Sequence, residues 1–137
     1  MKTTFDIIDK VFKIVNVTSV KTTIDGKVYR FARPLDSVLR DIVIFALPIA
    51  GGTYKDLQDC TVIINCFAKD LAPGRADESH IDTTTVAVLA LLEAYNSTTS
   101  PYLHLEINSQ AMMEDMDQAG IHYSSIRVNC TIQYLTT

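Results

Sequence analysis

The stretch from Thr83 to Asn96, TTTVAVLALLEAYN, constrains the fold of this chain more than any other segment. On a helical wheel its large apolar side chains sweep about 160°, wider than the stripe of about 100° that a one-sided surface helix needs. Those side chains are Val88, Leu89, Leu91, Leu92 and Tyr95. Burying each of them stabilises the fold by about 1.5 to 3 kcal/mol before the loss of conformational entropy is subtracted. We therefore expect a buried helix around which the other elements pack.

Length and composition point to one domain over residues 1–137, expected to bury roughly two thirds of the surface of its unfolded chain. The longest apolar run, Val86 to Leu92, falls far short of the roughly 20 residues of a membrane span. The start of the chain carries acidic residues and is not a secretory signal, so we expect a cytoplasmic protein. Cys60, Cys66 and Cys130 lie among strand-forming residues and are expected to be buried free thiols.

Charge is divided unevenly along the chain. Up to Pro48 there are eight basic and five acidic residues, and from Ile49 onward four basic and eleven acidic residues. A nucleic-acid binder would present a continuous basic surface, so sequence-specific nucleic-acid binding is not expected. The division permits complementary contacts between copies of the molecule, and it is equally compatible with an ordinary solvated surface.

The first third of the chain predicts a helix, a hairpin and a strand. Thr3 or Thr4 can cap a helix whose apolar residues recur at helical spacing: Phe5, Ile8, Phe12 and Val15. The turn pair Asp25-Gly26 predicts a β-hairpin of Val20–Ile24 and Lys27–Phe31. The run Ile42–Leu47 is apolar on both faces and predicts a central strand.

The remainder predicts three strands around the buried helix. Cys60 to Ala68 reads as a strand whose even-numbered residues face the core, and Ser79 or Asp82 is expected to cap the helix. Tyr102–Asn108 and a last strand ending at Tyr134 alternate apolar and polar residues, which predicts an antiparallel pair joined by Ser109–Gly120. The expected fold is α+β, a mostly antiparallel sheet with two helices packed on it as a two-layer sandwich.

Few residue patterns indicate chemistry. The outward face of the last two strands is polar, and on it His104 and Glu106 could share a metal or act as acid and base, but they lack a nearby third ligand or nucleophile. A sheet face that is simply exposed to solvent explains the same alternation of polar and apolar residues. No catalytic, cofactor or metal motif is present, so we expect a protein that is not an enzyme and needs no cofactor. The segment Ala111–Asp117 alternates Met with acidic residues, which favours a contact loop over plain core filling.

The order of these elements resembles that of phage tail-terminator and head-to-tail joining proteins, which are small α+β proteins of the phage neck. The likeness runs through the first helix, KTTIDGKVYRF, the strand ending at Leu47-Pro48, TVIINCFAKD, the apolar helix and HYSSIRVNCTIQYL. It implies a non-enzymatic homo-hexameric ring that caps the tail tube and binds neck proteins. It also implies assembly in the host cytoplasm and then a place in the virion.

A ring needs two different patches that meet between neighbouring copies, and the charge division offers such a pair. Candidate interface residues are the basic hairpin (Lys27, Arg30, Arg33), the long loop (Arg75, Asp77, Glu78) and the acidic Met segment (Met113, Glu114, Asp115, Asp117). Reversing Arg30 and Arg33 to Glu should then weaken assembly in a salt-dependent way. The alternatives are a small-ligand-binding protein or enzyme subunit that uses His104, Glu106 and Arg127, and a toxin- or immunity-like partner protein.

Overall fold

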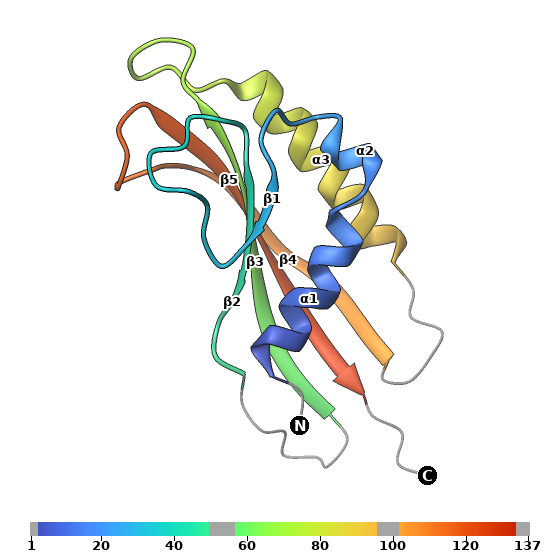
Figure 1. Cartoon of the computed structure of the whole chain (residues 1–137). Coiled ribbons are helices and arrows are strands. Elements are labelled where there is room, and N and C mark those ends of the chain that lie inside the picture. The colour runs from blue at the N-terminus through green and yellow to red at the C-terminus, as the bar shows by residue number, and fades with distance from the viewer. Residues whose placement is uncertain (1–2, 50–56, 96–101, 134–137) are drawn as a thin grey trace.

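A computed structural model of the protein describes residues 3–49, 57–95 and 102–133 (Figure 1). It contains helices α1 (Thr4–Val15), α2 (Thr18–Lys21) and α3 (Glu78–Ala94), and strands β1 (Val28–Arg30), β2 (Ile42–Ala46), β3 (Leu57–Lys69), β4 (Tyr102–Glu114) and β5 (Ile121–Gln133). The α+β class expected from the sequence is confirmed. Within the described ranges, no helix has both the length and the apolar character to cross a membrane.

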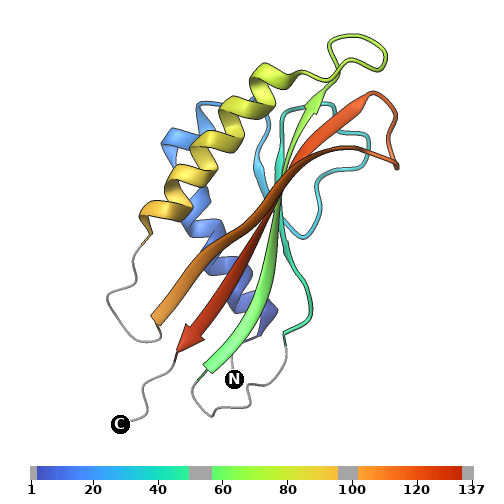
Figure 2. The same ribbon diagram turned by 180° about the vertical axis from the view of Figure 1, so that it is seen from behind.

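The five strands form one sheet in the order β1-β2-β3-β5-β4. Every neighbouring pair is antiparallel except β1 and β2, which run parallel. All three helices lie on one face of this sheet, as Figures 1 and 2 show from opposite sides. The connection from β1 to β2 lies on the other face. The sheet therefore has two edges, the short β1 and the long β4.

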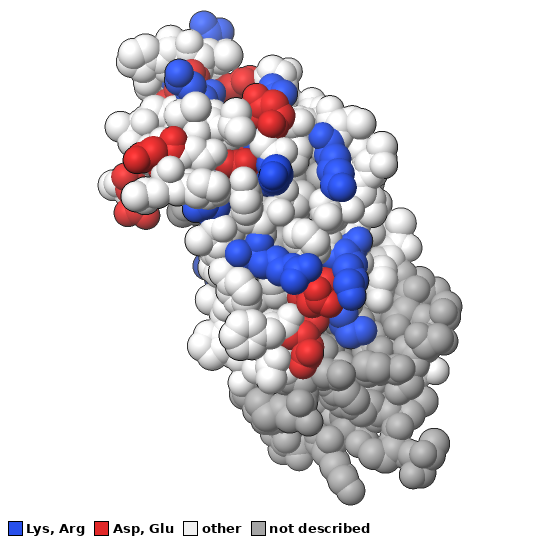
Figure 3. Space-filling view, in the orientation of Figure 1, with Lys and Arg blue, Asp and Glu red and all other residues white. Residues whose placement is uncertain are grey.

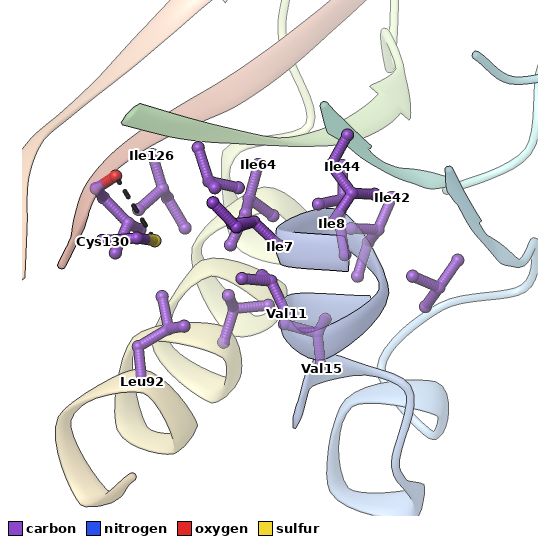
Figure 4. Close-up of a cluster of buried hydrophobic side chains, with 14 of the residues drawn as sticks. Ile7, Ile8, Val11, Val15, Ile42, Ile44, Ile64, Leu92, Ile126 and Cys130 are labelled. Carbon is purple, nitrogen blue, oxygen red and sulfur yellow. Dashed lines mark hydrogen bonds between the residues drawn. The ribbon is translucent and has the colours of Figure 1, made fainter. Parts of the chain in front are cut away.

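The core fills the space between the helices and the sheet (Figure 4). Ile7, Ile8, Val11 and Val15 of α1 are buried against apolar residues of the strands. The inward strand residues are the even-numbered ones of β3 and β5, including Val62, Ile64, Cys66, Ile126, Val128 and Cys130. The predicted even-numbered core face is thus confirmed for both strands, because alternation along an extended chain sends successive side chains to opposite faces.

The three cysteines are free and buried, as expected. Removal from water raises the pKa of the Cys66 thiol to about 12. Burial, reinforced by the neighbouring Cys60, raises the pKa of Cys130 to about 12 as well. A thiol is a nucleophile or a metal ligand only as the thiolate, so these two side chains act as small apolar core residues.

Helix α1 begins where the sequence predicted, but it turns a different face inward. Thr3 caps it, and the side chains of Thr3 and Asp6 each accept a hydrogen bond from the backbone N–H of the other residue. Phe5, which we expected on the packed face, is exposed, and Ile7 and Val11 are fully buried instead. The stripe that packs is therefore rotated toward Ile7, leaving Phe5 available at the surface.

The predicted hairpin around Asp25-Gly26 is wrong. Its first strand is replaced by α2, and its second, β1, pairs in parallel with β2. The Asp25-Gly26 turn is held by Arg40 instead: the Arg40 N–H donates to the Asp25 carboxylate at 2.7 Å, and the Gly26 N–H donates to the Arg40 carbonyl at 3.1 Å. Burial of Val20 in the core accompanies the helical turn, so long-range packing overrides the local turn signal.

Two predicted boundaries were also wrong. Helix α3 begins at Glu78 with Asp77 as its cap, earlier than the predicted Ser79 or Asp82. Strands β4 and β5 extend to Glu114 and back to Ile121, so the connection covers only residues 115–120 and not Ser109–Gly120. Pairing with β5 supplies hydrogen bonds to a polar segment whose composition alone reads as a loop.

Candidate assembly surfaces

The surface formed by α1, α2 and β1, which we call the basic edge, carries most of the positive charge of the first part of the chain. From Thr4 to Arg30 it has five Lys or Arg residues against three Asp. Figure 3 shows blue side chains over these elements, with few red ones among them. The basic residues are Lys10, Lys13, Lys21, Lys27 and Arg30.

Part of the acidity on the basic edge is already neutralised within the chain. Asp9 pairs with Lys13 at 3.0 Å and with Arg30 at 3.2 Å. The hydrogen bond from Lys13 and the charges of Lys13 and Arg30 lower the pKa of Asp9. The Arg30 guanidinium also lies 4.2 Å from the centre of the Phe12 ring. Arg30 is therefore held in one position on the surface while its side chain stays accessible to solvent.

An exposed aromatic pair adjoins the basic edge. The rings of Phe5 and Phe31 lie 5.4 Å apart between centroids, yet Phe5 is 67% exposed and Phe31 is 49% exposed. Phe31 also has a φ of 71°, a left-handed conformation that a bulky residue rarely adopts and that costs about 1 to 3 kcal/mol. Its N–H donates to the Ile44 carbonyl at 2.8 Å, which fixes this backbone against β2. We call Phe5 and Phe31 the aromatic knob.

The opposite edge of the sheet, formed by α3 and β4, is acidic, and we call it the acidic edge. These two elements contain no Lys or Arg between Glu78 and Ala94 or between Tyr102 and Glu114. Their acidic residues are Glu78, Asp82, Glu93, Glu106 and Glu114, all exposed. Since α3 and β4 flank a single edge of the sheet, this charge is gathered on one side of the molecule.

A groove of about 600 Å³ runs between α3 and β4 on the acidic edge. Its lining combines the apolar side chains of Ile81, Val86, Leu89 and Met112 with the polar ones of Ser79, Thr85 and Gln110 and the acidic Glu78 and Asp82. Val86 is 57% exposed and Met112 is 44% exposed. Of the five side chains that made up the predicted apolar width of the helix, only Leu89 lines this groove, and the exposed Val86 was not among them.

A β-bulge decides which Met residue reaches this groove. The pairing of β4 with β5 shifts between Ile107 and Ser109, so Asn108 is an extra residue in β4. Before the bulge the odd-numbered residues of β4 point toward the helices, and after it the even-numbered ones do. Met112 therefore lines the groove, while Met113 points to the other face. The candidate interface residues Met113 and Glu114 belong to a strand and not to a loop.

Arg33 lies inside the molecule. Its side chain is only 9% exposed, its Nη1 lies 3.7 Å from Asp41 Oδ2, and its Nη2 lies 3.5 Å from Asp115 Oδ2 and from Gln118 Oε1. The guanidinium also lies 3.9 Å from the centre of the Phe67 ring, which packs on Tyr123. Two of our candidate interface residues, Arg33 and Asp115, are thus brought together as an internal ion pair.

Asp41, the fully buried partner of Arg33, is held by two further donors. The Lys27 N–H donates to it at 3.0 Å and the Ser37 hydroxyl at 2.5 Å. Together Arg33, Asp41 and Asp115 join the β1–β2 connection to the β4–β5 connection across the outer face of the sheet. No pattern in the sequence indicates this cluster, because Asp115 is 82 positions from Arg33 and none of the three residues follows a motif.

The other candidate residues are separated from one another. Asp77 is buried and caps α3, accepting from the His80 N–H at 3.4 Å and contacting His80 Nδ1 at 2.6 Å. Glu78 follows it at the side of the groove, whereas Arg75 is exposed in the turn closed by Ala72. Asp117 is exposed in the β4–β5 connection. Lys27 and Arg30 lie together on the basic edge.

The polar outer face of β4 and β5 is present as predicted. His104 and Glu106 lie opposite Thr131 and Asn129 of β5, and both are exposed, as is Arg127. Among the described residues, no group of three or more His, Cys, Asp or Glu side chains is arranged to hold a metal ion. Tyr134, which we predicted to continue the inward face, lies outside the described residues.

By its architecture the chain is an α+β protein with a mostly antiparallel sheet covered by helices on one face. No protein-family model matches it, and no curated protein matches it in sequence. Among solved structures, its fold is similar to that of a chain from the virion of a native gene transfer agent particle. The two chains are 10% identical and superpose with a TM-score of 0.56, over 90% of this chain and 91% of that one. At this level of identity the likeness concerns the fold.

Proposed function

We propose that this chain is a non-enzymatic structural protein of a phage or prophage particle. The observation that carries the proposal is the likeness to a virion chain, which extends over nine tenths of both chains and is not limited to one motif. More specifically, we propose a tail-terminator-like role, in which copies of the chain assemble into a ring, of six in the simplest case, that joins the tail tube to the head. Its partners would be itself, the tail tube and neck proteins.

The surface of the molecule supports self-association. Monomeric proteins rarely expose large contiguous apolar patches, and patches that are exposed commonly mark contacts with other proteins. Here the groove and the aromatic knob lie at opposite edges of the sheet. A molecule with two different patches on opposite sides forms head-to-tail contacts, which close into a ring when the rotation between copies permits.

The mass in solution tests this proposal. Light scattering after size exclusion, over a concentration series from micromolar upward, should show a particle of about six times the chain mass of 15.2 kDa, or a monomer that moves toward it as concentration rises. Negative-stain images of the largest species should show closed rings. A strict monomer or a closed dimer at every concentration would refute ring assembly.

A matched variant separates this proposal from a ligand-binding role of the polar sheet face. His104→Ala with Arg127→Ala removes two of the side chains that a ligand would use on the sheet face opposite the groove, and it leaves the acidic side chains of α3 and β4 in place. A ring-forming protein should assemble normally with both substitutions. Loss of assembly in this variant, or metal-dependent stabilisation of the unsubstituted chain, would instead favour a site on that face.

A further inference from the structure

The charges of the two sheet edges are complementary. β1 and β4 are separated by the three strands β2, β3 and β5, which at about 4.8 Å per strand places these two strands about 19 Å apart. Helices α1 and α2 contact α3 on the covered face of the sheet, but the residues beside β1 and those beside β4 lie at opposite ends of the strand order. A second copy can bring the residues beside β1 against those beside β4.

The apolar features of the two edges are complementary in the same sense. The basic edge adjoins an exposed pair of rings, the aromatic knob, and the acidic edge holds the groove between α3 and β4. Aromatic side chains that fill a pocket on the partner commonly carry much of the binding energy of an interface. The left-handed backbone of Phe31 is a further indication, since such strain concentrates at functional positions.

Pairing of β4 with another β4 is disfavoured by the same structure. The bulge at Asn108 interrupts the regular row of N–H and C=O groups that an added strand would need. Such a contact would also place the acidic side chains of one copy, including Glu106 and Glu114, against those of the other. The acidic edge is therefore better suited to a side-chain contact with a basic surface than to strand addition.

We propose that the next copy of this chain occupies the groove, with its aromatic knob against the apolar side chains of the lining and its basic edge against the acidic ones. Lys27 and Arg30 of one copy then lie near Asp82 and Glu114 of the next. This head-to-tail contact rests on the ring assembly proposed above and specifies the surfaces that form it. Arg33 and Asp115 take no part, because they are paired inside each molecule.

Charge exchange between two variants tests the contact. Lys27→Glu with Arg30→Glu makes both edges acidic, and Asp82→Lys with Glu114→Lys places positive charges at the two positions that would lie near Lys27 and Arg30 of the next copy. Each variant alone should require at least about a tenfold higher concentration for half-assembly than the unsubstituted chain, because like charges meet at every contact. A 1:1 mixture should assemble near the original concentration, since alternating copies restore opposite charges at every contact. The mixture also shows that both variants are folded.

As controls, the charge reversals Asp59→Lys and Lys69→Glu on the central strand β3 should leave assembly like that of the unsubstituted chain. Normal assembly of either edge variant alone would overturn the proposed contact, and so would a mixture that fails to assemble. In both of those cases the ring proposal would stand if the unsubstituted chain forms rings. An unsubstituted chain that stays monomeric would refute the ring proposal and this contact together.

The apolar part of the contact has its own test. Phe5→Ser removes an exposed ring without disturbing the core, so the thermal midpoint should hold while the concentration for half-assembly rises. Leu71→Ser, at an exposed apolar residue of the β3–α3 connection that lines neither the groove nor the pocket beside Phe31, is the matched control. Equal assembly of the Phe5 variant and its control would overturn the role of the aromatic knob.

Discussion

Replacing Arg33 should destabilise the folded chain strongly, although an arginine in a connection between strands would ordinarily be replaceable. Removing one partner of a buried ion pair costs about 3 to 5 kcal/mol, because the remaining charge is left without compensation. Asp41 keeps its hydrogen bonds from Lys27 and Ser37, and both ion-pair distances are long, at 3.5 and 3.7 Å, which lowers this cost. Loss of the stacking on Phe67 adds about 0.5 to 2 kcal/mol. We expect Arg33→Ala to lower the free energy of unfolding by about 3 kcal/mol.

Two further variants separate the charge of Arg33 from its bulk. Arg33→Met keeps most of the apolar stem and should lose about 2 kcal/mol, less than Arg33→Ala. Lys69→Met, which removes a charge from an exposed position on β3, should stay within about 0.5 kcal/mol of the unsubstituted chain.

Equilibrium unfolding in urea, monitored by circular dichroism at a concentration where the chain is monomeric, measures all three free energies. A double-mutant cycle with Asp115→Asn should give a coupling energy of at least about 0.5 kcal/mol with Arg33→Ala. Free energies within about 0.5 kcal/mol of the unsubstituted chain for both Arg33 variants would refute the structural role. The same reasoning makes Arg33→Glu unsuitable as an interface probe, because a third carboxylate would join Asp41 and Asp115.

Two other predictions concern the backbone and the core. Gly26→Ala would place a Cβ against Asp41 Oδ1 and 2.7 Å from the Arg40 carbonyl oxygen. Urea unfolding should therefore show a free energy of unfolding lower by about 1 to 3 kcal/mol. Gly74→Ala should cost less, because the space around that residue is open and only its φ of 75° is unfavourable. The raised pKa of Cys66 predicts negligible alkylation of the folded chain at pH 8 and rapid alkylation in urea; native labelling as fast as in urea would contradict it. Because the pKa of Cys66 is higher in the folded state, keeping this thiol protonated favours folding fully below pH 9, and the free energy of unfolding falls as the pH rises toward about 12. The slope is at most about 1.4 kcal/mol per pH unit. Cys66→Ala should reduce this slope.

The sequence predicted best where burial imposes a regular period. The even-numbered faces of β3 and β5 could be assigned because one side of each strand is in the core and the other is not, so a shift by one residue would bury Asn65 or Arg127. The helix was recognised from the same kind of periodicity, but its predicted burial was only partly correct: Val88 and Leu92 are buried, and Leu89, Leu91 and Tyr95 are half-buried. Its start was missed because Asp77, Ser79 and Asp82 are all capable caps, and only the fold selects Asp77.

The errors arose where two distant segments compete with a local signal. Asp25-Gly26 is a strong hairpin turn by composition, yet both residues bond to Arg40, which the sequence does not place beside them. The polar segment after Asn108 reads as a loop by composition, but each residue from Ser109 to Glu114 is paired with a residue of β5. Local propensity is worth tenths of a kcal/mol per residue, which a buried side chain or a strand pairing readily exceeds.

The candidate surfaces were predicted in part. The division of charge along the chain and the apolar width of the helix were visible in the sequence, and both contribute to the acidic edge and its groove. Arg33 and Asp115 could not be separated from the accessible charges, because side chains 82 positions apart show no relation until the chain is folded. The aromatic knob was also missed, since Phe5 fits a helical stripe equally well whether or not that side of the helix is covered.

The extra residue in β4 has a consequence for comparing this chain with distant relatives. Removing Asn108 would leave Ile107 opposite Val128 and Ser109 opposite Arg127 in an uninterrupted ladder, so every later residue would keep its present partner. A deletion at any other position of β4 would carry the residues between it and Asn108 to the opposite face. In an alignment of β4 with a chain of only 10% identity, a single-residue gap therefore belongs at Asn108, and alignments that place it elsewhere would equate inward positions with outward ones.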